Sequence, residues 1–327
     1  IAQGSPQMVR RRAVRAVQRF QVLATMLGVS SDEGVAVELY GLNGESATIT
    51  VKLLVPVDKG PEENNEREST ILPGNIGYLR IPSFSGPANV PALVREWMPR
   101  LKDTQALIID VRGNGGGSRA GLVELFPYFQ REGEFHVGNV SAYRLYPEFK
   151  ENHLSDARFS YREDDQRWEP WERQAIADFR QEFVPEWNHQ PGDFSDWHYL
   201  VSSKRKGDPR FYYGNDIYVL IDDGCFSATD IFAGTFKGFR NTLLVGQPTS
   251  GGSARSVTED LPHSKIRIRL ASMVSFQPDG QLYDGRGIHP DIYVDATPDS
   301  FLNDGKDNVL NVVLDRIHSE RQKRTDE

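Results

Sequence analysis

Ser227 is the residue whose type and position are best suited to chemistry. It follows an apolar segment, 217–221, that we expect to be a strand, and it precedes a predicted helix over 228–237. The first N–H groups of a helix have no partner within the helix, and the helix dipole is positive there. A serine hydroxyl beside such groups can act as a nucleophile with an oxyanion site next to it. The same position also suits a serine that only caps the helix, so both interpretations stay open.

Two glycine-bearing segments also follow predicted strands. The continuous apolar run 106–111, typical of a strand buried on both faces of a parallel sheet, leads into the glycines of 113–117. The segment 249–252 (TSGG) follows a short strand predicted at 243–245. Because the carboxyl ends of parallel strands meet at one edge of a sheet, we expect both loops to approach Ser227. The glycine run fits neither GxxxxGK[ST] nor GxGxxG, so a nucleotide site is not expected.

Composition limits the classes of function. The chain has 327 residues, 38% hydrophobic and 26% charged, with a net charge of -8. This balance is typical of a globular protein and disfavours nucleic acid as a partner. No apolar run is long enough to predict a membrane-spanning segment. Cys225 is the only cysteine, so it can form neither a disulfide within the chain nor a zinc site by itself. We interpret it as a small buried residue or as one that shapes the site around Ser227.

The order of predicted elements indicates three parts. Residues 1–57 contain a basic amphipathic helix and a hairpin, and the polar stretch 58–70 is expected to be a linker. Residues 71–327 alternate strands with helices, which predicts an α/β core. An aromatic-rich insertion at about 130–210 interrupts this core, and we expect it to be either a surface excursion or a wall beside a cleft.

Five motifs, taken in order, carry a resemblance to a known family. They are GNIGYLRIPSF at 74–84, DVRGNGGG at 110–117, SATD at 227–230, TSGG at 249–252 and GRGIHPD at 285–291. Together they resemble the tail-specific (carboxyl-terminal processing) serine protease family, and within it the tricorn-core branch. The resemblance implies a crotonase-like core over roughly 74–320, preceded by the trailing half of a PDZ-like domain in the first 57 residues. It also implies polypeptide substrates and an exported or periplasmic location, and it leaves open an oligomer.

The resemblance assigns roles to particular positions. Ser227 stands where the family has its nucleophile, and the Ala228 N–H stands where the family has one oxyanion donor. The second donor is expected from the glycine turn. Gly116 is favoured because many relatives have proline, which lacks an N–H, where this chain has Gly115. The implied chemistry needs no metal and no organic cofactor.

One departure from the family pattern matters for the mechanism. The processing-protease branch pairs its serine with a lysine, and this chain has Gly252 at the lysine's position and Ser256 at that of a following glutamine. The TSGG segment instead resembles the tricorn-core branch, in which a histidine activates the serine and an acid orients the histidine. Asp284 occupies the position of that acid, where relatives usually have glutamate.

The histidine lies far upstream in the relatives. This chain opens with Ile1 and resembles an excised or processed piece, so we expect the base to come from a missing upstream region. Two alternatives stay open. The chain could be a catalytically inactive peptide-binding relative, or it could be an acyl-thioester enzyme, because crotonase-like cores also carry that chemistry.

Overall fold

The computed structural model describes most of the chain, in two units. The described residues are 4–18, 20–28, 35–40, 44–51, 68–86, 89–145, 156–188, 192–295 and 307–326. The first unit combines Ile1–Met8 with Glu68–Glu327, and the second is Val9–Arg67. Most of the predicted linker therefore lies outside the described residues.

The smaller unit contains the helix and hairpin elements predicted for this part of the chain. Helix α1 (Pro6–Gln18) begins in the first unit and continues into the second, where α2 (Phe20–Leu27) follows. Strands β1 (Val35–Tyr40) and β2 (Ser46–Val51) pair antiparallel. The PDZ assignment stays a prediction.

A six-stranded sheet forms the centre of the larger unit. Its order is β13-β9-β8-β5-β4-β3, and only β3 is antiparallel to its neighbour. The strands are β3 (Thr70–Leu72), β4 (Ile76–Arg80), β5 (Ala106–Asp110), β8 (Asp216–Ile221), β9 (Thr242–Gly246) and β13 (Ile292–Tyr293). Every residue of β5 is buried, as its continuous apolar sequence predicts.

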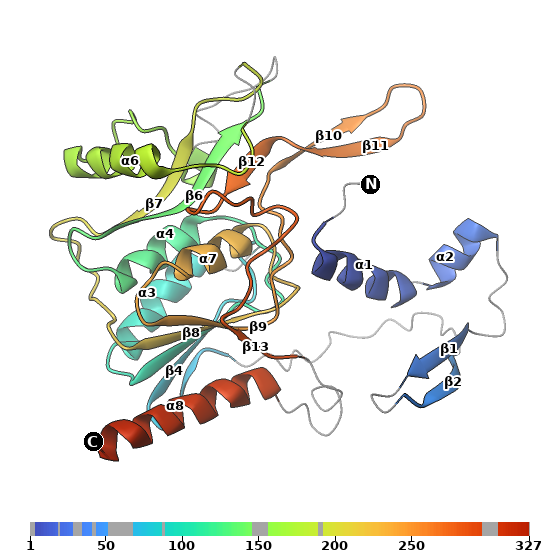
Figure 1. The fold of residues 1–327 in the computed structure, drawn as a ribbon, viewed down its shortest axis with the longest axis horizontal. Coiled ribbons are helices and arrows are strands. Elements are labelled where there is room, and N and C mark those ends of the chain that lie inside the picture. Colours follow the sequence, from blue (N-terminus) through green and yellow to red (C-terminus); the bar gives the residue numbers. More distant parts are fainter. Residues whose placement is uncertain are drawn as a thin grey trace. The chain divides into compact units, whose positions relative to one another are not determined.

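Helices cover both faces of this sheet (Figure 1). One face packs against α3 (Val90–Leu101), α4 (Ala120–Leu125), the short 3-10 helix η1 (Phe126–Phe129) and α7 (Ala228–Phe236). The opposite face packs against α8 (Asn308–Asp326), so successive residues of β5 enter different cores: Leu107 and Ile109 face α7, and Ile108 faces α8. The α/β prediction is confirmed at the level of a mixed α/β fold.

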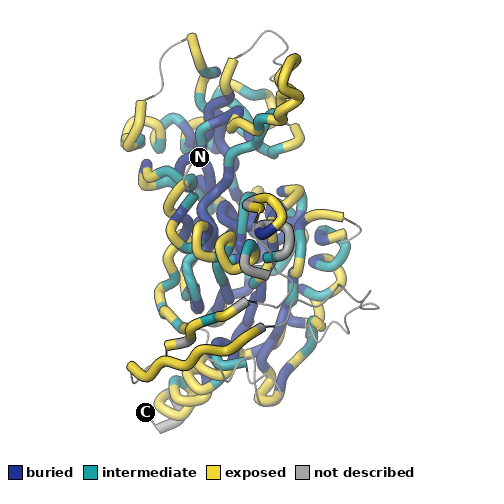
Figure 2. The backbone as a smooth tube through the Cα atoms, turned by 90° about the vertical axis from the view of Figure 1, so that its right-hand side faces the viewer, coloured by how far each residue is buried: buried dark blue, intermediate teal, exposed yellow. Residues whose placement is uncertain are grey.

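The insertion builds a second sheet. Strands β6 (Phe135–Tyr143) and β7 (His198–Ser203) pair antiparallel, and β12 (Met273–Phe276) completes a three-stranded sheet in the order β12-β6-β7. Helix α6 (Pro170–Glu182) contributes Ile176 to the core beneath this sheet. A separate hairpin, β10 (Ser256–Asp260) and β11 (Arg267–Ala271), projects from the body of the unit (Figure 1). Burial is greatest along strands such as β5, β6 and β8, whereas the β10–β11 hairpin and the outlying turns and helix surfaces are mostly exposed (Figure 2).

None of the helices in the described part of the chain is both long enough and apolar enough to cross a membrane.

Candidate active site

Ser227 lies in a strained turn between a buried strand and a buried helix. Strand β8 ends at Ile221, and Ser227 occupies the N-cap position of α7 with φ 61° and ψ -113°. A positive φ is uncommon for a residue with a side chain and costs on the order of 1–3 kcal/mol. The surrounding contacts must therefore hold this backbone in place.

Asp230 supplies much of that restraint. Its Oδ2 accepts the Ser227 N–H at 2.7 Å, and its Oδ1 accepts the Thr249 hydroxyl at 2.5 Å. The N–H groups of Gly251 and Gly252 also donate to this carboxylate, at 2.9 and 3.2 Å. Complete burial raises the pKa of Asp230 to about 6, although these hydrogen bonds oppose the rise. One buried carboxylate thus joins Ser227 to the segment 249–252.

Gly116 lies directly against Ser227 from the other side. Its φ is 91°, and a Cβ added there would lie 2.7 Å from the Ser227 Cβ and 2.9 Å from the Ala228 nitrogen. Only glycine fits so close an approach. The Gly116 N–H donates to Asn114 Oδ1 at 2.9 Å. The Ala228 N–H opens α7 and meets no acceptor within the described ranges.

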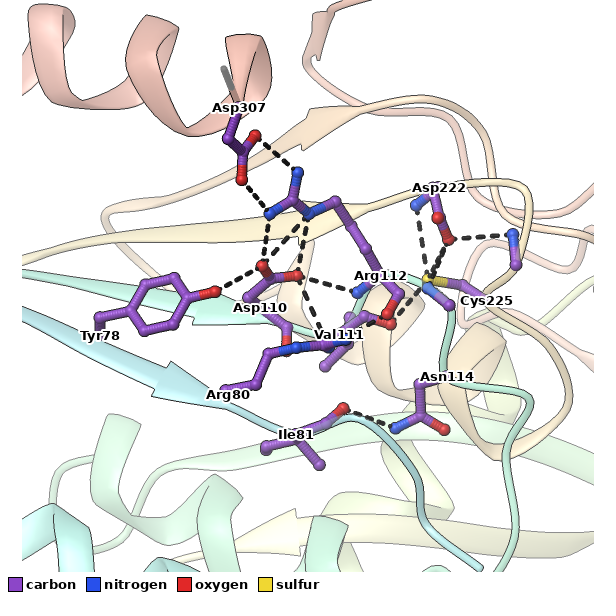
Figure 3. A network of polar contacts seen from close by, with 12 residues as sticks. Tyr78, Arg80, Ile81, Asp110, Val111, Arg112, Asn114, Asp222, Cys225 and Asp307 are labelled. Atoms are coloured by element: carbon purple, nitrogen blue, oxygen red, sulfur yellow. Dashed lines mark hydrogen bonds and ion pairs between the residues drawn. The ribbon is translucent and has the colours of Figure 1, made fainter. Parts of the chain in front are cut away.

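Asn114 ties the glycine turn to the segment before Ser227. Its side chain is fully buried, and Nδ2 donates to the Ile81 carbonyl oxygen at 3.0 Å (Figure 3). The Asn114 carbonyl oxygen accepts the Phe226 N–H at 3.0 Å. Because its Oδ1 also accepts the Gly116 N–H, Asn114 fixes both segments that flank the serine.

Cys225 and Asp222 stabilise the same turn. The Cys225 thiol is fully buried and donates to the Val111 carbonyl oxygen at 3.1 Å (Figure 3). Asp222 Oδ1 accepts the N–H groups of Gly113 and Gly224 at 2.8 and 2.9 Å. Burial raises the pKa of Cys225 well above its usual value, which favours the unreactive thiol. Cys225 therefore helps to shape the turn as a buried structural residue.

An ion-pair network fixes the start of the glycine turn. Arg112 Nη2 lies 2.6 Å from Asp110 Oδ2, and the Tyr78 hydroxyl donates to that same oxygen at 2.7 Å (Figure 3). The guanidinium also donates to both carboxylate oxygens of Asp307, at 2.8 and 2.6 Å. The turn that carries Gly116 is thus anchored to the start of α8.

Asp284 lies close to the segment that follows 249–252. Its Oδ1 accepts the N–H groups of Ser253 and Ala254 at 3.0 and 3.3 Å, and Oδ2 accepts the Ser253 hydroxyl at 3.2 Å. Burial raises its pKa, although these hydrogen bonds oppose the rise. Its predicted role in orienting a histidine stays a prediction.

The five described histidines make other contacts or lie on the surface. His136 on β6 is buried, which lowers its pKa to about 4, and His198 Nδ1 lies 2.8 Å from the Asp196 carbonyl oxygen. The other three described histidines are exposed: His263, His289 and His318. None of these five donates to or accepts from Ser227 or Asp284. Two more, His153 and His189, lie outside the described residues.

Across the described ranges, no group of three or more His, Cys, Asp or Glu side chains is arranged to hold a metal ion.

Comparison with known proteins identifies the family. The sequence model of peptidase family S41 matches residues 75–294, well over half of the chain. The chain belongs to peptidase family S41, a family of serine peptidases. It is 28% identical over 88 residues to a probable CtpA-like serine protease of Staphylococcus aureus. That match covers 27% of this chain and 18% of the relative.

Two solved structures share the fold. A candidate peptidase from Parabacteroides merdae aligns with a TM-score of 0.54 at 19% identity, over 76% of this chain and 63% of that one. Mature CPAF in complex with lactacystin aligns with a TM-score of 0.53 at 16% identity, over 83% and 65%. The predicted protease family is therefore confirmed, while the tricorn-core branch stays a prediction.

The sequence interpretation missed two residues that build the site. The motif SATD includes Asp230 and the glycine-rich segment 113–117 includes Asn114, but neither residue was assigned a role from the sequence. A signal for Asp230 was available, because an acidic residue three positions after a helix N-cap can accept the cap's backbone N–H. No comparable local signal marks Asn114, whose partners come from distant segments.

Proposed function

We propose that this chain is a serine endopeptidase domain of the tricorn-core type and that Ser227 is its nucleophile. The observation that carries the proposal is the strained Ser227 backbone, held between Gly116 and Asp230 at the start of α7. Strain of this kind persists where surrounding contacts enforce it, and such positions cluster at active sites. In this mechanism the Ser227 hydroxyl attacks a peptide carbonyl and forms a tetrahedral intermediate.

Two backbone groups stabilise the oxyanion in this proposal. The Ala228 N–H is available at the positive end of α7, and the Gly116 N–H is the second donor. On substrate binding, the oxyanion replaces Asn114 Oδ1 as the acceptor of the Gly116 N–H. Each such donor lowers the barrier by about 3 kcal/mol in serine proteases.

In this proposal the general base is not among the residues of this chain. We assign it to a histidine in a region upstream of this chain, with Asp284 holding the imidazole in the correct orientation. The contacts of Asp284 with Ser253 and Ala254 support a carboxylate fixed in position beside the segment that follows 249–252. A serine without such a base is a weak nucleophile at neutral pH, so the chain by itself is expected to have little or no activity while the full-length parent protein is active.

The proposal also assigns a fold class to each of the two units. The larger unit is a crotonase-like core, and the helices and hairpin of the smaller unit are part of a PDZ-like domain. Extended or unfolded polypeptides are the proposed substrates, and they enter beside the aromatic-rich insertion.

Loss of the Ser227 hydroxyl tests the function. Ser227→Ala is compared with Ser319→Ala, which removes an exposed hydroxyl on α8. Casein cleavage and labelling by a fluorophosphonate are measured in the chain and in the full-length parent protein. We expect Ser227→Ala to abolish both and Ser319→Ala to change neither. Equal cleavage by the unchanged and Ser227→Ala parent proteins refutes the assignment.

Fluorophosphonate labelling and a separate binding measurement distinguish the two alternatives. An inactive peptide-binding relative predicts no labelling of Ser227 even in the full-length parent protein. An acyl-thioester enzyme predicts binding of a coenzyme A ester, which can be measured directly by calorimetry.

A further inference from the structure

A cavity of about 490 Å³ lies between helix α6 and the start of strand β7, in the aromatic-rich insertion. Helix α6 packs on the sheet that contains β7 (Figure 1). The cavity is open to solvent, because the lining side chains of Asp164 and Asp196 are 72% and 73% exposed. Its volume falls within the range of small-molecule sites, about 300–1,000 Å³.

The acidic side chains that line this cavity already have cationic partners. Glu163 Oε2 accepts from Arg180 Nη1 at 2.8 Å. Asp164 and Asp196 both pair with the Arg162 guanidinium, at 3.1 and 3.2 Å. A bound cation would have to compete with these arginines, so the acidic groups do not favour a cationic ligand.

Tyr199 brings a hydrogen-bond donor without an acceptor to the cavity. Its side chain is 1% exposed and lines the cavity, and its hydroxyl has no hydrogen-bond partner among the described residues. The hydroxyl end faces α6, because it interacts electrostatically with Arg180 and Glu163. Burial raises the pKa of Tyr199 to about 12, so the hydroxyl keeps its proton at neutral pH. This buried donor therefore needs an acceptor from a ligand.

Two arginines of α6 offer further donors to the same cavity. Arg173 and Arg180 are seven residues apart, which places them on one face of the helix and roughly 10 Å apart along its axis. Arg173 Nη2 reaches only the carbonyl oxygens of Asp165 and Trp168, at 3.4 and 3.5 Å, and no described carboxylate pairs with it. Glu163 engages a single nitrogen of Arg180, and a guanidinium has five N–H donors.

We propose that this cavity binds a small organic dianion with a carboxylate at each end. One carboxylate pairs with Arg173, and the other accepts from Arg180 and from the Tyr199 hydroxyl. A guanidinium binds a carboxylate through two parallel N–H···O bonds. The hydrocarbon chain between the two carboxylates lies against Trp197, which also lines the cavity. The site is separate from the segments that hold Ser227 and does not depend on the proposed peptidase function.

A series of linear dicarboxylates tests both the charge and the spacing. Succinate, adipate, suberate and sebacate are titrated into the chain in a chloride buffer, and binding is measured by isothermal titration calorimetry. Octanoate, with one carboxylate, and octanediamide, with none, are the controls. We expect suberate to bind about 10-fold more tightly than succinate or octanoate, and octanediamide not to bind. Equal affinity across the series, or no binding of any dicarboxylate, overturns the proposal.

Conservative substitutions locate the binding site. Arg173→Gln and Tyr199→Phe are each expected to weaken suberate binding about 10-fold, and Arg173→Gln is also expected to remove the advantage of suberate over octanoate. The matched controls are Arg267→Gln on the β10–β11 hairpin and Tyr293→Phe on β13, both at exposed side chains, and they are expected to leave the affinity unchanged. Unchanged affinity in both cavity variants overturns the site.

Stability separates a binding role of the Tyr199 hydroxyl from a structural one. Without ligand, Tyr199→Phe keeps the buried ring and is expected not to lower the melting temperature, because the hydroxyl has no hydrogen bond to lose. With suberate, the unchanged chain is expected to gain melting temperature and Tyr199→Phe to gain less. A lower melting temperature in Tyr199→Phe together with an equal gain from suberate overturns the role of this hydroxyl.

Discussion

The close approach of Gly116 to Ser227 gives the sharpest test of the site. In Gly116→Ala the new Cβ would lie 2.5 Å from the Phe226 carbonyl oxygen and 2.7 Å from the Ser227 Cβ. An ordinary contact begins at 3.4 Å, so the serine must move by about 0.7 Å and its carbonyl neighbour by about 0.9 Å. A misplacement of about 1 Å costs roughly 100-fold in rate, which is about 2.7 kcal/mol of barrier.

Gly113→Ala is the matched control. Gly113 also has a positive φ, 73°, but an added Cβ there would meet nothing within 4 Å. Both variants carry a backbone cost of about 1–2 kcal/mol, which thermal unfolding measures. Only Gly116→Ala is expected to lose about 100-fold in the rates of casein cleavage and Ser227 labelling in the full-length parent protein. Equal rates in the two variants would falsify the argument that this contact positions the nucleophile.

Three other predictions concern buried ionisable groups. The pKa of Asp230 is raised from 3.8 to about 6 on folding, so the folded chain holds this proton more tightly than the unfolded chain. As pH rises from about 4 to about 6, the unchanged chain should lose on the order of 3 kcal/mol of unfolding free energy relative to Asp230→Asn. Urea denaturation at a series of pH values measures this difference, and parallel pH profiles for the two proteins would refute the prediction. Arg112→Met leaves the Asp110 carboxylate, 2% exposed, without its main partner and should cost about 3–5 kcal/mol. Asp307→Asn changes a carboxylate that is 32% exposed and should lower the free energy of unfolding by only about 1 kcal/mol. Similar losses in the two variants would contradict the prediction that the buried Asp110 carboxylate depends on Arg112. Cys225 should resist iodoacetamide in the folded chain at mildly alkaline pH and react in concentrated guanidinium; rapid labelling of the folded chain shows that the thiol is accessible.

Local patterns predicted the parts of the site that follow strands. The buried runs before Gly113 and before Ser227 are strands β5 and β8, and they lie next to each other in the sheet. Parallel neighbours place their following loops at the same edge, which explains why Gly116 meets Ser227. This inference needed only the order of apolar and glycine-rich segments.

Other features could not be predicted, because their partners are distant in sequence. Strand β12 joins β6 across about 130 residues, so no local pattern reveals the second sheet. Arg119 follows a serine and a glycine turn, a setting typical of a solvated side chain, yet it is among the most buried large residues. Asp284 was predicted from its position in a motif, but its contacts with Ser253 and Ala254 required the structure.

The start of the chain has a practical consequence for handling the protein. The Ser5 hydroxyl donates to the Ser250 carbonyl oxygen, and Gln7 Nε2 donates to the carbonyl oxygens of Thr249 and Arg286, each at 2.6 Å. Substitutions of Ser5 or Gln7 would therefore disturb the same loop that Asp230 holds against the serine. Variants made for kinetic comparison should therefore keep Ser5 and Gln7 unchanged.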